Sequence, residues 1–203
     1  MNTKGKVYTV VFTFVASFIF ILLLALVDTL VADQISRNEE LSRVRALLNA
    51  MNIPYATDTE ALRLFHKEVT ALTSNGIDYY RYERNGETVY GLIHRGDGLW
   101  GTITIAVAVN QDLTRMIGLD VISQNETPGL GARIDESWFK AQFQGERLGA
   151  GGRLTVGEPG PGDTDHGNGK VDAITGASLT SRQLGIIVND ALATLRRALG
   201  GAG

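Results

Sequence analysis

Apolar and polar positions along the chain predict an apolar helix at its start. From residue 7 to residue 27 no side chain is charged, and Phe, Leu, Ile and Val dominate. At about 1.5 Å per helical residue this run spans roughly 30 Å, the hydrocarbon thickness of a bilayer. A cleaved signal peptide has a shorter apolar core and small residues before the cut, which Leu30-Val-Ala32 matches poorly. We therefore expect an uncleaved transmembrane helix.

Two further helical patterns follow the apolar run. Residues 37–51 carry apolar side chains on one face and stop before a proline, so a helix is expected there, either separate or continuing the apolar helix as a stalk. Thr57 and Glu60 have the spacing of a capping box. This spacing predicts a second helix that runs to about Leu72.

The sequence predicts strands in the middle of the chain and a helix at its end. Asn85-Gly86 is a strong hairpin signal between two β-rich runs. Beyond residue 180, apolar side chains recur every three to four positions up to Leu199. The strands are expected at residues 77–83, 88–94, 102–109 and 113–123.

These elements predict an α+β fold with one antiparallel sheet, flanking helices and a single N-terminal transmembrane helix. We divide the chain into an anchor at residues 1–30, a helical stalk and lead-in at residues 31–75, and one domain at residues 76–203. The order of the strands in the sheet does not follow from the sequence.

The amino-acid composition excludes several kinds of partner and site. The formal net charge is −3 and no basic stripe is present, so nucleic acid is not expected as a partner. The chain has no Cys, which excludes disulfides, thiolate catalysis, Cys-bound zinc and iron–sulfur ligation. Its three His residues lie far apart in the sequence. No metal site is therefore expected.

A Gly- and Pro-rich segment precedes the last helix. Residues 149–170 include alternating acidic side chains from Asp163 onward, a pattern that can indicate calcium. The spacing lacks the closing Glu and the central Gly of a helix–loop–helix calcium site. A flexible surface loop is the preferred interpretation.

The most informative stretch lies at the start of the last helix. Residues 172–181 read DAITGASLTS, with hydroxyl side chains around Gly176 and Ala177. Free backbone N–H groups at a helix N-terminus form a natural seat for phosphate. The plain alternative is that Ser178 or Thr180 caps the helix.

This stretch resembles the flavinylation motif of the FMN-binding domain family, roughly Asp-x-x-Ser/Thr-Gly-Ala-Thr/Ser-x-Thr. Members include the G subunit of the Rnf electron-transport complex and the C subunit of the sodium-translocating NADH:quinone reductase (Nqr). Thr175 and Ser178 replace the commoner Ser and Thr, and both keep a hydroxyl. In the family the last threonine carries FMN through a phosphoester, which implies Thr180 here.

Two further segments resemble the same family, in the same order. Residues 126–131 read ETPGLG, a loop that contacts the flavin in the family, and Trp138 and Phe139 follow on a short helix-like segment. Residues 96–101 read GDGLWG, and an aromatic side chain after a Gly-rich bend can form one wall of a flavin pocket. Ordinary core packing is the alternative for Leu99 and Trp100.

The resemblance implies a set of site residues. Thr180 would hold FMN covalently, Asp172 would be recognised by the transferase, and no residue is expected to be catalytic. The other residues implied in FMN binding are Leu99, Trp100, Glu126, Thr127, Leu130, Thr175, Gly176, Ala177, Ser178 and Leu179. Because Leu179, Ser181 and Arg182 offer Thr180 no base, we expect attachment by a separate FAD-dependent flavin transferase.

The implied function is electron carriage by FMN in a membrane-bound, ion-translocating oxidoreductase complex, with the other membrane subunits as partners. The chain length favours the Rnf type over the longer Nqr type. The alternatives are the C subunit of an Nqr-type complex, a membrane-anchored flavin-binding or sensing module, and a structural anchor without flavin. No ion pathway is expected in a single span without ionisable residues.

The charges beside the apolar run indicate its orientation. Lys4 and Lys6 precede it, and Asp28 and Asp33 follow it. The positive-inside rule then places the N-terminus in the cytoplasm and the FMN-binding domain outside it. We expect a single-pass protein of a bacterial-type inner (plasma) membrane, with its domain on the periplasmic or extracellular side.

Overall fold

The computed structural model describes residues 3–84 and 86–200. Asn85 of the expected hairpin turn and the side chain of Lys4 lie outside the described residues. The chain forms two compact units, Met1–Glu40 and Leu41–Gly203.

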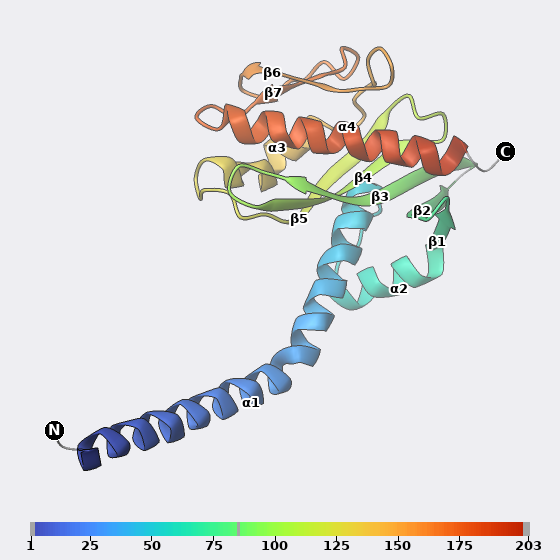
Figure 1. Cartoon of the computed structure of the whole chain (residues 1–203). Helices are drawn as coiled ribbons and strands as arrows, with labels where there is room; N and C mark the ends of the chain where they lie inside the picture. Colours follow the sequence, from blue (N-terminus) through green and yellow to red (C-terminus); the bar gives the residue numbers. More distant parts are fainter. Residues whose placement is uncertain (1–2, 85, 201–203) are drawn as a thin grey trace. The chain divides into compact units, whose positions relative to one another are not determined.

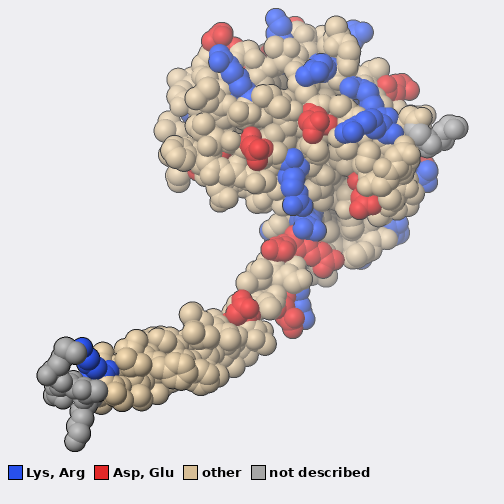
Figure 2. Space-filling model, in the orientation of Figure 1, with Lys and Arg blue, Asp and Glu red and all other residues tan. Residues whose placement is uncertain are grey.

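The first unit consists of one apolar helix. Helix α1 (Thr3–Ala50) is continuous, so the segment at residues 37–51 extends the apolar helix and does not form a separate one (Figure 1). An 18-residue window within it has a mean hydropathy of 3.0, and none of that window is buried. Figure 2 shows the surface of this helix free of charged side chains over a long stretch after its basic end. By length and composition the helix is able to cross a membrane.

The second unit begins with the last turns of α1. Leu47, Leu48 and Ala50 are buried there. Helix α2 (Asp58–Glu68) then starts as predicted, because the Thr57 side chain accepts a hydrogen bond from the Glu60 backbone N–H at 3.2 Å.

Helix α2 ends earlier than expected. It stops at Glu68, and residues that were assigned to its last turn form strand β1 (Val69–Ser74). Asn75 and Gly76 both have positive φ, 53° and 74°, which closes a tight hairpin to the next strand. The prediction to Leu72 was therefore wrong, since the β-branched residues here pair with a neighbouring strand instead of continuing the helix.

Five strands form one antiparallel sheet in the order β1-β2-β3-β4-β5, which confirms the predicted antiparallel sheet (Figure 1). After β1, the strands are β2 (Ile77–Arg84), β3 (Glu87–Asp97), β4 (Thr102–Asn110) and β5 (Met116–Ser123). Strand β5 starts later than predicted. The Asn110 side chain accepts hydrogen bonds from the backbone N–H groups of Thr114 and Arg115, both at 2.9 Å, and holds these residues in a loop.

Both faces of the sheet are covered. On one face Ile103, Ile105 and Val107 join a core with α4, the last helix. On the other face Ala106 and Ala108 join a second core with the end of α1 and with α2. Alternate residues of β4 thus serve opposite cores, as the pleat of a strand requires.

The remaining elements follow the sheet in the sequence. They are the 3-10 helix η1 (Gly131–Asp135), helix α3 (Ser137–Ala141), strands β6 (Thr155–Pro159) and β7 (Lys170–Ala173), and helix α4 (Ser178–Gly200). Helix α3 carries Trp138 and Phe139 as expected. The expected flexible loop at residues 149–170 was wrong in part, because β6 pairs with β7 in parallel.

A close approach between α1 and the sheet gives a stability prediction. A Cβ atom on Gly118 would lie 2.8 Å from the Ala50 carbonyl oxygen, a backbone atom that cannot turn aside. We expect Gly118→Ala to destabilise this unit by about 2 kcal/mol through overpacking. Urea denaturation followed by tryptophan fluorescence measures the change.

Gly157→Ala is the matched control. Its Cβ would meet the nearest atom, the Val171 carbonyl oxygen, at 3.6 Å, which is ordinary contact. Equal midpoints for the two variants would contradict the close packing of α1 on β5.

Candidate functional site

Three segments that are distant in the sequence meet at the N-terminus of α4. They are the loop between β3 and β4, the segment that follows β5, and the turn between β7 and α4. Together they enclose a cavity of about 480 Å³. Its lining consists of Leu99, Trp100, Thr127, Leu130, Gly131, Gly176, Ala177, Ser178, Leu179 and Thr180.

The structure therefore brings together nearly all of the residues expected at the FMN site. Two are not part of the lining. Thr175 is exposed on the turn before α4, and Glu126 lies buried behind the cavity wall. Gly131 is the residue that sequence reasoning missed, although it closes the ETPGLG loop, of which Glu126, Thr127 and Leu130 were expected at the site.

The cavity walls are apolar and open to solvent. Leu99, Trp100, Leu130 and Leu179 are 48%, 71%, 45% and 59% exposed. Among the described residues of the second unit, Ile186 alone joins them as an exposed large apolar side chain. Such side chains are normally buried, so their gathering around one cavity indicates a surface that another molecule covers.

A tight turn places the start of α4 against this wall. Gly176 has a φ of +83°, and a Cβ there would lie 3.3 Å from Leu130 Cδ2. The buried Ser181 hydroxyl fixes the turn, since it accepts from the Ile174 N–H and donates to the Ala177 carbonyl, both at 3.0 Å. The small residues of this stretch thus allow close approach of backbone to wall.

Thr180 does not act as a helix cap. It is 2% exposed, and its hydroxyl donates a hydrogen bond of 2.6 Å to Glu126 Oε2. The expectation that no base lies beside Thr180 was wrong. It considered sequence neighbours only, whereas this carboxylate arrives from 54 residues away in the chain.

Glu126 also connects the third segment. Its Oε1 accepts hydrogen bonds from the backbone N–H groups of Leu99 and Trp100, at 2.9 and 3.0 Å. One buried carboxylate thereby joins the β3–β4 loop, its own loop and α4. The sequence carries no local signal for these contacts.

Asp172 has partners inside the chain. Its Oδ2 accepts from the Gly162 N–H at 3.1 Å, and its backbone N–H donates to Gln142 Oε1 at 2.7 Å. The carboxylate thus holds the loop that precedes it. Recognition of Asp172 by a transferase stays a prediction.

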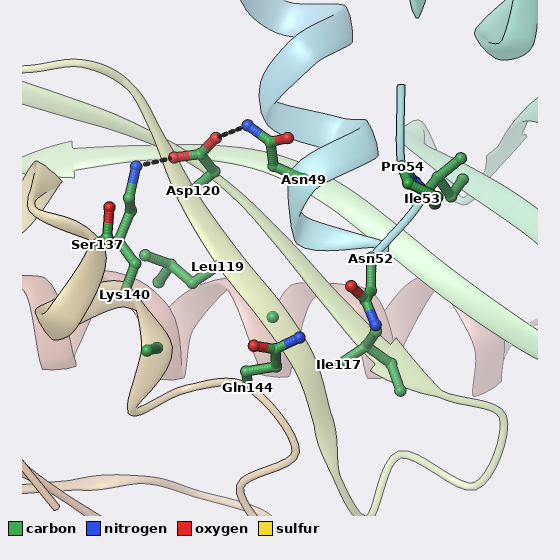
Figure 3. A pocket seen from close by; sticks show the side chains of 12 residues that line it. Asn49, Asn52, Ile53, Pro54, Ile117, Leu119, Asp120, Ser137, Lys140 and Gln144 are labelled. Atoms are coloured by element: carbon green, nitrogen blue, oxygen red, sulfur yellow. Dashed lines mark hydrogen bonds and ion pairs between the residues drawn. The ribbon is translucent and has the colours of Figure 1, made fainter. Parts of the chain in front are cut away.

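A second cavity, of about 420 Å³, lies between the residues after α1, strand β5 and helix α3 (Figure 3). Asp120 accepts hydrogen bonds there from Asn49 and Lys140, both at 2.6 Å. Burial lowers the pKa of Lys140, but its hydrogen bonds to Asp120 and Asp135 outweigh burial and raise it. None of the residues expected at the FMN site lines this cavity. The first cavity is therefore the candidate site.

The acidic loop before β7 is organised by its own hydrogen bonds. Asp163 accepts from Asn168 Nδ2 and from the Asp165 N–H, both at 2.7 Å, and these bonds lower the pKa of Asp163. Within residues 3–84 and 86–200, no three His, Asp or Glu side chains are placed to hold a metal ion.

The known proteins that are similar in sequence include subunits of two kinds of redox complex. The chain is 40% identical over 90 residues to the C subunit of the Na⁺-translocating NADH-quinone reductase of Neisseria meningitidis, covering 43% of this chain and 34% of that protein. It is 32% identical over 126 residues to the G subunit of the proton-translocating ferredoxin:NAD⁺ oxidoreductase complex of Clostridium ljungdahlii. This match covers 61% of this chain and 63% of that protein. The match thus spans about a third of the Neisseria protein.

Two crystal structures share the fold. NqrC of Shewanella oneidensis superposes with a TM-score of 0.66 at 19% identity, covering 77% of this chain and 93% of that one. The C subunit of the Na⁺-translocating NADH-quinone reductase from Parabacteroides distasonis superposes with a TM-score of 0.66 at 24% sequence identity. This match covers 81% of this chain and 95% of that one. Residues 98–193, which contain the whole lining of the cavity, match the model of the FMN-binding domain family, and this confirms the resemblance that the three motifs indicated.

Proposed function

We propose that this protein is an electron-carrier subunit of a membrane-bound, ion-translocating oxidoreductase complex and that it carries FMN as a phosphoester on Thr180. The observation that carries the proposal is the convergence of three separate motifs on one cavity with Thr180 in its lining. FMN, when bound, supplies the chemistry of accepting and donating electrons.

The cavity fits a flavin. Leu99, Trp100 and Leu130 offer exposed apolar surface for a flat aromatic ring. The small residues Gly176 and Ala177 leave space in the cavity next to the attachment residue. A phosphate on Thr180 would lie in the first turn of a 23-residue helix, where backbone N–H groups and the helix dipole favour negative charge.

A covalent bond suits a domain outside the cytoplasm. A cofactor that is held only by affinity is lost when its free concentration falls below its dissociation constant. A phosphoester removes that dependence and leaves the ring system of FMN unmodified. A separate FAD-dependent transferase would install the group, recognising the stretch that includes Asp172.

The apolar part of α1 would anchor the chain in the bilayer through residues 7–27. Its exposed apolar surface supports this placement, because such a surface is stable in lipid and not in water. Lys6 before the span and Asp28 after it favour a cytoplasmic N-terminus and a domain on the periplasmic or extracellular side.

The Rnf type is our preferred assignment over the Nqr type. The match to the Clostridium G subunit covers 63% of that protein, against 34% of the Neisseria C subunit. The higher identity to the Neisseria protein, 40% against 32%, keeps the Nqr type as the second candidate. In either complex the partners would be the other membrane subunits.

Removal of the Thr180 hydroxyl tests the proposed attachment residue. We expect Thr180→Val to lose in-gel flavin fluorescence and the FMN mass increment after co-expression with a flavin transferase, because Val offers no hydroxyl. Ser178→Ala, a cavity-lining hydroxyl on the same turn, should keep labelling. Intact mass followed by peptide mapping gives the readout, and labelled Thr180→Val would move the site elsewhere.

Little space is left beside the Thr180 hydroxyl. A Cβ on Gly131 would lie 2.7 Å from Thr180 Oγ1 and 2.9 Å from Glu126 Oε2. We expect Gly131→Ala to slow labelling at least about tenfold, since small displacements of reacting groups cost this much or more. Gly157→Ala is the control, and equal labelling rates for both would argue against a reaction at this spot.

Cysteine labelling tests on which side of the membrane the domain lies. The chain has no Cys, so single cysteines report location without interference. We expect Glu87→Cys, at an exposed position of β3, to react with a membrane-impermeant maleimide in intact spheroplasts. Asn2→Cys, which keeps both lysines before the span, should react only after permeabilisation. If the two cysteines reacted in the opposite way, the proposed orientation would be wrong.

A further inference from the structure

Glu126 is a buried carboxyl group whose contacts all lie inside the described chain. It is 4% exposed, and its two oxygens have different partners. Oε1 accepts from the N–H groups of Leu99 and Trp100, while Oε2 accepts from the Thr180 hydroxyl at 2.6 Å. The short bond joins a buried carboxylate to the hydroxyl that we propose to be esterified.

The surroundings of this carboxylate hold it at that place. A Cβ on Gly98 would lie 2.5 Å from Oε1, and one on Gly131 would lie 2.9 Å from Oε2, so the two glycines leave just enough room. Among the ion pairs of the described residues, none includes Glu126. Within the described part of the chain, N–H and O–H groups are the donors to its two oxygens, and no cation is paired with Oε2.

We propose that Glu126 is the group that accepts the Thr180 proton when FMN is transferred to this residue. The inference rests on the proposed attachment of FMN to Thr180. A threonine hydroxyl is a weak nucleophile, and enzymes activate such groups with an adjacent base. A general base must lie within about 2.6–3.2 Å of the atom whose proton it takes, and Glu126 Oε2 meets this requirement.

The step balances with FAD as the phosphoryl donor. Thr180 Oγ1 forms a bond to the phosphorus of the FMN half, and the bond from that phosphorus to the bridging pyrophosphate oxygen breaks. The bridging oxygen leaves with its electron pair on AMP. The Thr180 proton passes to Glu126 Oε2 and then to solvent. No electrons are exchanged with an oxidant or reductant.

This assignment divides the work between two proteins. The transferase would hold FAD and stabilise the leaving AMP, and the acceptor chain would supply both the nucleophile and its base. Glu126 is therefore a catalytic residue of the acceptor, because it contacts the reacting oxygen directly.

The amide variant separates proton acceptance from positioning. Glu126→Gln keeps an oxygen for the Leu99 and Trp100 N–H groups and keeps a hydrogen-bonding group beside Thr180, but the new NH₂ donates and cannot accept the proton. Glu126→Ala removes both functions. Glu136→Gln, the same chemical change at an exposed carboxylate ten positions along the chain, is the matched control.

The experiment uses the full chain in detergent with a purified FAD-dependent flavin transferase and FAD, with labelling followed by intact mass. We expect Glu126→Gln to lower kcat at least about 100-fold, as loss of a general base does. KM for the acceptor chain and the thermal midpoint should stay near their wild-type values. Glu136→Gln should label within twofold of wild type.

The outcomes distinguish the two proposals. If Glu126→Gln labels at the wild-type rate while Glu126→Ala does not, Glu126 only positions Thr180 and the inference is overturned. If Thr180→Val is still labelled, the attachment site and the role of Glu126 fall together. If wild type is labelled on Thr180 and both Glu126 variants react normally, the proposed function stands without this base.

Discussion

The candidate site depends on one buried carboxylate. Glu126 joins three segments that lie far apart in the sequence, two loops after different strands and the last helix. A polar side chain that is removed from water must find hydrogen-bond partners, or its burial is costly. The need to satisfy Glu126 therefore fixes Leu99 and Trp100 relative to Thr180, and this spacing defines the cavity.

The sheet provides the platform for this arrangement. Its strands follow one another in sequence order and alternate in direction, so the segments after β3 and β5 leave the sheet at the same end. Helix α4 packs over one face through Leu184, Val188 and Leu195, which are fully buried. This packing on the sheet holds the N-terminus of α4 against the two loops that follow β3 and β5.

Much of the fold followed from local patterns, because local interactions create it. The Thr57 cap and the strands around residues 77–110 depend on residues that are close in the sequence. The end of α2 did not follow, although Asn75-Gly76 carries the same hairpin signal as Asn85-Gly86. The choice between helix and strand at Val69 was made by pairing with Tyr82, a tertiary contact.

In the candidate site, too, some features follow from local sequence and others from tertiary contacts. Its residues could be named from motifs, because each segment carries its own recognisable sequence. Their connection through Glu126 could not, since hydrogen bonds between residues 54 positions apart leave no periodic trace. The internal partners of Asp172 were hidden for the same reason, as they come from a loop and from Gln142.

The continuity of α1 has a practical consequence for soluble derivatives of this protein. Val44, Leu47 and Leu48 belong to the same helix as the apolar segment, yet they are buried in the core under the sheet. A truncation between residues 30 and 40 removes the anchor and leaves that core whole. A truncation at residue 76 also removes β1, α2 and the end of α1, so Ala106 and Ala108 would face water and the exposed sheet would invite aggregation.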